Sequence, residues 1–387
     1  MDRFYFDHNA TTPVSAEVLE AMLPVLRDVY GNASSIHHFG QMARQKLELA
    51  RRQTSALLNA KPQEIVFLSG GTEADNLAIL GAVRRSKKPR PHVITSAVEH
   101  PAVLNTCSRL ERDGVDVTYI RVPADGLIDP NDVRRALRPD TALISIMHAN
   151  NELGTLQPVA EIARVAREAG VPMHSDGVQA AGKLPVDVNG LGVDLYSISA
   201  HKICAPKGIG ALFVRKGTRI GPILYGGHHE RDRRPGTENV AGAVAMGAAS
   251  VWIEENLETE AARVRSLRDR VEQGILDRVP HAFVNGGSAP RTPNTTNIRF
   301  DGVEGEALVI ALDLRGFAVS SGAACSSGAV EPSHVLQAIG LTREQARSSL
   351  RFSLGRSNTA GQVDALVEAV AESVAHLRRL SPVYAHA

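Results

Sequence analysis

Short apolar runs alternate with stretches of helical periodicity over the first two thirds of the chain. The apolar runs have the length of buried strands, and turn residues bound them. The predicted strands lie at residues 64–69, 92–97, 116–122, 142–148, 171–176, 194–200 and 210–217. Helical stretches between them lie at residues 72–85, 101–114 and 158–170. Strands joined by helices imply crossover connections, so we predict an α/β unit with a mostly parallel sheet.

The pattern changes near residue 257. Beyond it, predicted elements are a charged helical stretch, a short apolar run, a second helical stretch and an amphipathic C-terminal helix, at residues 258–279, 296–300, 304–316 and 363–380. This order favours a second, smaller α+β domain. We therefore expect a large domain at residues 15–257 and a small domain formed by residues 1–14 and 258–387.

Composition narrows the possible partners. The 387 residues carry a formal net charge of +1, and 4% are aromatic. A balanced charge gives no global attraction to nucleic acid or an anionic membrane, and few rings are available to stack on bases. The N-terminal residues lack the apolar core of a signal peptide, and the Ala/Gly-rich stretch 240–253 is too short to span a bilayer, so it is expected to be a buried helix. We expect a cytoplasmic protein with no nucleic-acid or membrane partner.

The three cysteines are Cys107, Cys204 and Cys325, and none belongs to a C-x-x-C pair. An odd, small number of cysteines argues against a disulfide framework or a zinc ribbon and favours a reducing compartment. Cys107 lies on an apolar helical face and is expected in the core. Cys325 lies in SSGAACSSGAVEPSHVL, which has no apolar periodicity, so we expect a loop whose thiol is reactive, with an inert loop cysteine as the alternative.

A lysine stands where α/β sheets bind ligands. In SISAHKICAPKGIGALFV, residues 197–214, a predicted strand ends next to Lys202 and a glycine-rich turn leads into another strand. A lysine amine can form a Schiff base with a carbonyl cofactor. A surface lysine on a loop is the alternative.

Other residues near predicted strand ends suit a phosphate-bearing aromatic cofactor. The segment Ser69-Gly70-Gly71-Thr72 joins a strand to a helix, whose N-terminus favours an anion, although Thr72 also suits a helix N-cap. Asp176 could pair with a protonated pyridine nitrogen, or simply form a turn. His100 could stack on a ring and move protons, or be structural.

Several motifs together resemble one family. The segments FDHNATTPV, SGGTEADN, EHPAV, HANNELG, HSDGVQAAGKLPVD, SAHK…PKGIGAL and LRFSLGR occur in this order over nearly the whole chain. They resemble the cysteine desulfurases of the NifS/IscS type, in the aminotransferase class V branch of fold-type I pyridoxal-phosphate enzymes. The resemblance implies the fold-type I architecture, pyridoxal 5'-phosphate as cofactor, L-cysteine as substrate and L-alanine as product.

The resemblance also implies roles for individual residues. Lys202 would hold the cofactor as a Schiff base, and Cys325 would receive sulfur as a persulfide. The remaining cofactor contacts would come from Gly71, Thr72, His100, Asn151, Asp176, Gln179, Ser199 and His201. Asn151 and Arg351 would fix the substrate carboxylate. Thr237 would reach the phosphate of a neighbouring subunit, which implies a homodimer with shared sites.

Several points stay open at this level. Cys204-Ala205 replaces the family's usual Tyr-Gly, and Gly71 replaces the more usual Ala. The sulfur acceptor could be an iron–sulfur scaffold, a tRNA-thiolation protein or a nitrogenase-maturation partner. No metal is expected for catalysis, although Cys325 could transiently ligate a cluster with a scaffold. The alternatives are a selenocysteine lyase, another class V aminotransferase or a non-catalytic sulfur-transfer scaffold.

Overall fold

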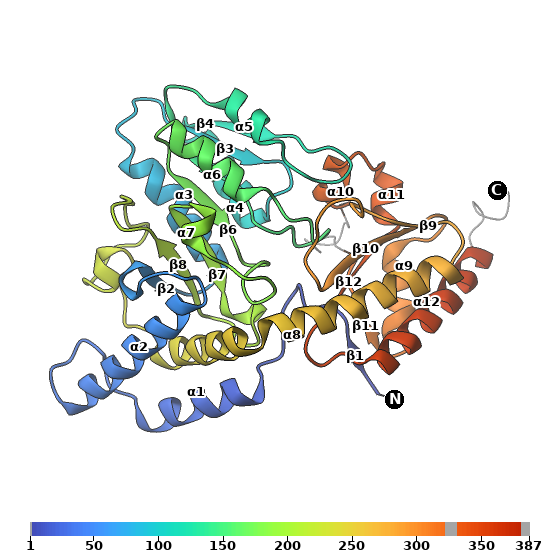
Figure 1. Cartoon of the computed structure of the whole chain (residues 1–387), viewed down its shortest axis with the longest axis horizontal. Helices are drawn as coiled ribbons and strands as arrows, with labels where there is room; N and C mark the ends of the chain where they lie inside the picture. The colour runs from blue at the N-terminus through green and yellow to red at the C-terminus, as the bar shows by residue number, and fades with distance from the viewer. Residues whose placement is uncertain (1, 322–330, 381–387) are drawn as a thin grey trace.

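The computed structural model describes residues 2–321 and 331–380. A seven-stranded sheet forms the centre of the larger part of the molecule (Figure 1). Its strands, in spatial order, are β2 (Ile65–Leu68), β8 (Gly210–Val214), β7 (Leu195–Ser199), β6 (Met173–Asp176), β5 (Thr141–Ser145), β3 (His92–Ser96) and β4 (Asp116–Ile120). Every residue of these strands except four in β4 is buried, as expected where helices cover both faces of a sheet.

The sheet is mostly parallel, as predicted, and β8 is the exception. It pairs antiparallel with both β2 and β7. Only residues 200–209 join β7 to β8, which is too short for the crossover that a parallel pair needs. The other six strands run in one direction, so their carboxyl ends share one edge of the sheet.

The predicted helices between strands are present. They are α3 (Gly71–Arg85), α4 (Pro101–Arg112) and α6 (Val159–Glu168). Two shorter helices, α5 (Pro130–Ala136) and α7 (Val188–Leu191), also lie between strands of this sheet. Two further helices near the N-terminus, α1 (Ala16–Asp28) and α2 (His38–Ala56), were not predicted. Both pack against α8 (Val240–Arg278).

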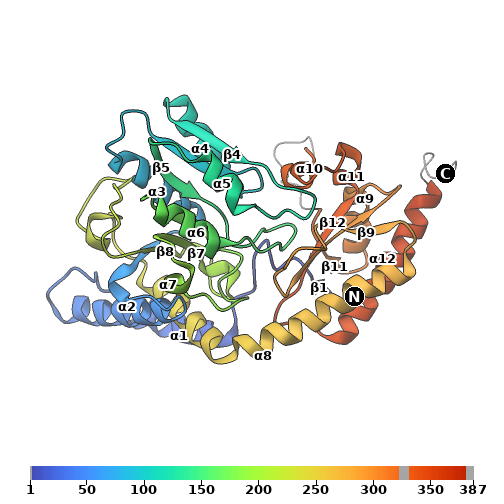
Figure 2. The same ribbon diagram turned by 45° about the horizontal axis from the view of Figure 1, so that its top comes forward.

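A smaller antiparallel sheet forms the second part of the molecule (Figure 2). Its strands are β12 (Ser349–Ser353), β10 (Thr295–Phe300) and β9 (Ala282–Val284), and its helices are α9 (Gly305–Asp313), α10 (His334–Ala338), α11 (Arg343–Arg347) and α12 (Ala360–Leu380). Nearby, β1 (Phe4–Tyr5) pairs in parallel with β11 (Phe317–Ala318). Phe6 is buried in the same hydrophobic cluster as Phe300 and Phe352, so the start of the chain packs with its end.

One helix runs through both parts. The 39 residues of α8 join the buried stretch at 240–253 to the charged stretch at 258–279, which the sequence pattern had separated. Met246 and Ala249 pack in the larger core, whereas Val271 and Ile275 pack in the smaller one. The expected domain boundary at residue 257 falls inside this helix, and the division into domains stays a prediction.

Among residues 2–321 and 331–380, no helix combines the length and the apolar character that a bilayer span requires.

Candidate active site

A cavity of about 390 Å³ opens at the carboxyl edge of the large sheet. Ten of the predicted site residues line it: Gly71, Thr72, His100, Asn151, Asp176, Gln179, Ser199, His201, Lys202 and Arg351. Thr237 does not line it and is exposed in the loop before α8. Cys325 lies outside the described residues. The structure thus gathers most of the predicted site, while the role of each residue stays a prediction.

Lys202 ends the short 3-10 turn (Ala200–Lys202) that follows β7. Its Nζ donates hydrogen bonds to the backbone oxygens of Asn9, at 2.5 Å, and Ala10, at 2.7 Å. Burial, with a smaller contribution from the nearby Arg351 charge, lowers the pKa of Lys202 to about 8. An appreciable fraction of this amine is therefore neutral near physiological pH, as a nucleophile toward a carbonyl requires.

Asp176 is the last residue of β6 and is buried. Its Oδ1 accepts a hydrogen bond from the backbone N–H of Val178 at 2.9 Å. Burial raises the pKa of Asp176, and the charges of His100 and Lys202 oppose that rise. A carboxyl group in this low-dielectric position gains strongly from a cationic partner, such as a protonated ring nitrogen.

The start of α3 can hold an anion. Gly70 occupies the N-cap position, which the sequence pattern had offered to Thr72, and no side chain caps the first amides of the helix. The buried Oγ of Ser199 faces no hydrogen-bond partner among the described residues. A Cβ atom on Gly71 would lie 2.8 Å from Cγ2 of Val178, so a side chain there would crowd the cradle. Free amides, a free hydroxyl and a positive helix end are the features of a phosphate site.

Two histidines whose pKa values are lowered line the cavity. His100 caps α4, and its Nδ1 accepts a hydrogen bond from the backbone N–H of Ala102 at 3.1 Å, which leaves the ring proton on Nε2. Burial lowers the pKa of His100. Burial also lowers the pKa of His201 to about 4, and this ring contacts the hydroxyl of Thr11 at 3.1 Å. His100 can therefore donate a proton or a hydrogen bond from Nε2, and it can accept a proton only on Nδ1, once Nδ1 releases the amide of Ala102.

Asn9 connects the cavity residues to one another, and sequence reasoning missed it. Its backbone oxygen accepts hydrogen bonds from Gln179 Nε2, at 2.9 Å, and from Lys202. Its side-chain oxygen accepts from Nζ of Lys183 at 2.8 Å, and its Nδ2 donates to the backbone oxygen of Asn151 at 3.0 Å. The only sequence signal was its place in the family motif FDHNATTPV.

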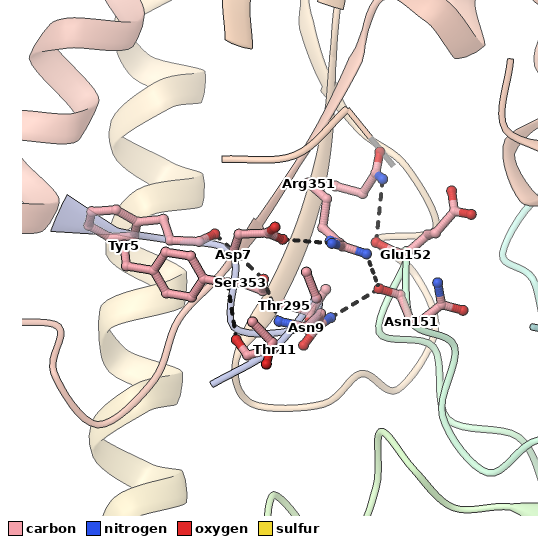
Figure 3. Close-up of polar contacts among 12 residues, drawn as sticks. Tyr5, Asp7, Asn9, Thr11, Asn151, Glu152, Thr295, Arg351 and Ser353 are labelled. Carbon is pink, nitrogen blue, oxygen red and sulfur yellow. Dashed lines mark hydrogen bonds and ion pairs between the residues drawn. The ribbon is translucent and has the colours of Figure 1, made fainter. Parts of the chain in front are cut away.

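Arg351 reaches the cavity from β12 (Figure 3). Its Nη1 donates to the backbone oxygen of Asn151 at 3.0 Å, and its Nη2 pairs with Oδ1 of Asp7 at 2.7 Å. The side-chain Nδ2 of Asn9 also donates a hydrogen bond to the hydroxyl oxygen of Thr295 in β10. Asp7 and Asn9 are thus bonded to β12 and β10 of the small sheet, and Asn9 is bonded to the segments that follow β5, β6 and β7 of the large sheet.

Pyridoxal phosphate fits this arrangement. The uncapped start of α3 and the free hydroxyl of Ser199 would hold its phosphate, Asp176 its ring nitrogen and Lys202 its aldehyde carbon. His100 lines the same cavity and would cover the ring.

The other two cysteines differ in environment. Cys107 is fully buried in the core, as predicted, and burial raises the pKa of its thiol to about 12. Cys204 is partly buried in left-handed backbone conformation, with φ 61°, and burial also raises its thiol pKa. Neither thiol is activated as a thiolate. No group of three or more His, Cys, Asp or Glu residues in the described part of the chain could hold a metal ion.

Comparisons with known proteins agree on one family. Residues 4–366 match the family model described as aminotransferase class V. A protein from Trichormus azollae named cysteine desulfurase is 49% identical over 99% of this chain and 95% of its own length. A solved structure of a NifS-like protein superimposes with a TM-score of 0.90 and 35% identity, covering 97% of this chain and 100% of the other. The solved structure of SspA in complex with cysteine gives a TM-score of 0.82 and 38% identity, covering 92% and 99%.

Proposed function

This chain belongs to the class V aminotransferase family, and from that premise we propose that it is a pyridoxal-phosphate-dependent cysteine desulfurase. It would convert L-cysteine to L-alanine and leave the sulfur on Cys325 as a persulfide. The observation that carries the proposal is the convergence of Lys202, Asp176, His100 and Arg351 on one cavity. The relatives named cysteine desulfurase and the cysteine complex of SspA support the choice of substrate.

The chain's own residues divide the work. Bound pyridoxal phosphate supplies an electron sink for the electron pair left when the α-proton of the substrate is removed. Asp176 would hold the ring nitrogen in its protonated form, and the free amine of Lys202 would take the α-proton of the substrate. Arg351, held against the backbone oxygen of Asn151, is placed to fix the substrate carboxylate.

Cys325 performs the sulfur transfer in this proposal. Its thiolate attacks the substrate sulfur, a sulfur–sulfur bond forms and the carbon–sulfur bond breaks. The electron pair of the broken bond stays on the substrate carbon, which takes up a proton and becomes the methyl group of alanine. An ordinary thiol is only a few per cent ionised at neutral pH, so a proton acceptor is needed; Nδ1 of His100 would take this proton after releasing its hydrogen bond from Ala102.

We also infer a homodimer. Large hydrophobic side chains on α1 and the following loop are exposed: Leu19 46%, Leu23 52%, Leu26 56%, Tyr30 72% and Ile36 90%. Such a concentration of exposed apolar groups is typical of a protein interface. The exposure of Thr237 suits the expectation that it contributes to the phosphate site of a second copy.

The proposed acceptor is a sulfur-binding protein such as an iron–sulfur scaffold, and the proposed location is the cytoplasm. Cys107 and Cys204 are unpaired, as is usual for thiols in a reducing compartment.

The test is a product assay on the holoenzyme. L-cysteine and a thiol reductant should yield sulfide and alanine in a ratio close to one. 3-Mercaptopyruvate formed by amino transfer, with no sulfide, would contradict desulfuration and favour an aminotransferase. Sedimentation should give a dimer mass, and Thr237→Ala should weaken cofactor binding without changing that mass.

A further inference from the structure

Asp7 and Arg351 form a largely buried ion pair at the edge of the cavity. Their side chains are 19% and 7% exposed, and the Nη2–Oδ1 distance is 2.7 Å (Figure 3). Asp7 follows β1, whereas Arg351 lies in the middle of β12. Arg351 lines the cavity and Asp7 does not. Asp7 therefore pairs with a guanidinium that borders the cavity, without lining the cavity itself.

The hydrogen-bond pattern leaves donors of Arg351 free for a ligand. Nη1 uses one N–H on the oxygen of Asn151, and Nη2 uses one on Asp7. The buried Nε has no partner among the described residues. A guanidinium has five N–H groups, so a carboxylate in the cavity can bind without displacing Asp7. Two carboxylates would then share a single positive charge.

We propose that Asp7 weakens the affinity of Arg351 for amino-acid carboxylates, an inference that rests on the proposed role of Arg351 in substrate binding. The Asp7 charge neutralises the guanidinium and repels a second carboxylate at short range. Because the pair is largely buried, solvent screens this repulsion little.

The chemistry of the reaction explains why weaker carboxylate binding at Arg351 would favour turnover. L-cysteine and L-alanine carry the same amine and the same carboxylate, so tight carboxylate binding would hold substrate and product alike. Binding that is equal in the ground state and the transition state does not speed the chemical step. A fixed negative charge paired with Arg351 keeps the orientation that the guanidinium provides and lets alanine leave.

The decisive experiment compares two ligands on the holoenzyme. Asp7→Asn keeps an oxygen that accepts the Arg351 hydrogen bond and removes only the charge. Titration with L-alanine, followed by cofactor absorbance or calorimetry, should give a Kd lower by about tenfold, as loss of a close like charge implies. Cysteamine has the amine and the thiol but no carboxylate, and its Kd should change by less than about twofold.

Matched variants separate charge from shape. Asp7→Glu keeps the charge and should bind alanine no more tightly than the parent. Asp364→Asn removes the charge of an exposed ion-pair partner of Arg270, outside the cavity. This variant should change the Kd of neither ligand. Asp7→Ser, a smaller neutral acceptor, replaces Asp7→Asn if that variant does not fold.

The outcomes distinguish two failures. Unchanged or weaker alanine binding in the neutral variants, while Arg351→Gln still loses alanine selectively over cysteamine, would overturn the role of Asp7 alone. If Arg351→Gln weakens alanine and cysteamine equally, the carboxylate role of Arg351 fails and the Asp7 inference fails with it. Sulfide production by the parent enzyme is independent of both results and tests the proposed function.

Discussion

The Nζ of Lys202 lies 2.5 Å from the backbone oxygen of Asn9, a residue 193 positions away in the sequence. The same oxygen accepts a hydrogen bond from Gln179, so two expected cofactor contacts share one acceptor in the N-terminal segment. This segment positions the lysine while leaving its amine at the cavity.

Cofactor capture should follow the titration of Lys202. The neutral amine is the nucleophile, and its fraction rises with pH and levels off above the pKa of about 8. The rate of absorbance change after pyridoxal phosphate is added to apoenzyme should therefore rise up to about pH 8 and then flatten. A rise continuing toward pH 10 would contradict the lowered pKa.

Borohydride reduction should place the label on Lys202, and Lys202→Ala should give no labelled peptide. Lys183 is the internal control, because its amine is also buried but does not line the cavity. Peptide mapping that finds the label on Lys183 or Lys207 would show that the assignment is wrong.

Asn9→Ala should destabilise the fold and loosen the site together. It removes four side-chain hydrogen bonds, to Lys183, Asn151, Asn294 and Thr295. Leaving buried partners unpaired should lower the free energy of unfolding by about 2–4 kcal/mol, measured by chemical denaturation. Asn256→Ala removes one partly exposed bond to Trp252 and should cost less than about 1 kcal/mol.

Asp176→Asn should keep the cofactor but lose at least ~100-fold in turnover, because an amide cannot stabilise a protonated ring nitrogen. Alanine formation under saturating cofactor measures this loss. Asp194→Asn is the control, since Asp194 is a partly buried carboxyl group next to the sheet whose pKa burial also raises, but it lies outside the cavity. Equal turnover in the two variants would argue against the electron-sink role.

Cys325→Ser should bind the cofactor and L-cysteine normally and release no sulfide, because a hydroxyl is essentially un-ionised and attacks sulfur poorly. Mass spectrometry after one turnover should find the added sulfur on Cys325 in the parent enzyme. Cys107→Ser and Cys204→Ser should keep nearly full turnover. Sulfide release with a sulfur adduct on Cys204 in the Cys325→Ser variant would move the acceptor role to Cys204.

Local patterns explain which site residues the sequence could predict. Asp176, Ser199 and Lys202 each follow or end a buried strand, and the carboxyl ends of parallel strands meet at one edge. The glycines at the start of α3 likewise indicate a phosphate site, because the residues that form it are close together in the sequence.

Contacts distant in sequence could not be predicted in this way. Asp7 and Arg351 are 344 positions apart, and nothing in their neighbours' hydrophobic pattern pairs them. The continuity of α8 was missed because the composition of the helix changes along its length. Its first half is rich in Ala and Gly and packs in the larger core, whereas its second half is rich in charged residues and packs in the smaller core.

The pairing of residues 7–9 with β12 also sets an order on biosynthesis. The backbone N–H groups of His8 and Asn9 bond to Ser353, and Arg351 bonds to Asp7, so this segment, which is made before β12, finds its place only after β12 has been synthesised. At about 5–20 residues per second, that segment waits tens of seconds for its partners. Until then Lys202 lacks the Asn9 oxygen that holds it, and a growing chain has no complete cofactor site. Cofactor capture is therefore reserved for chains in which β12 has already been synthesised.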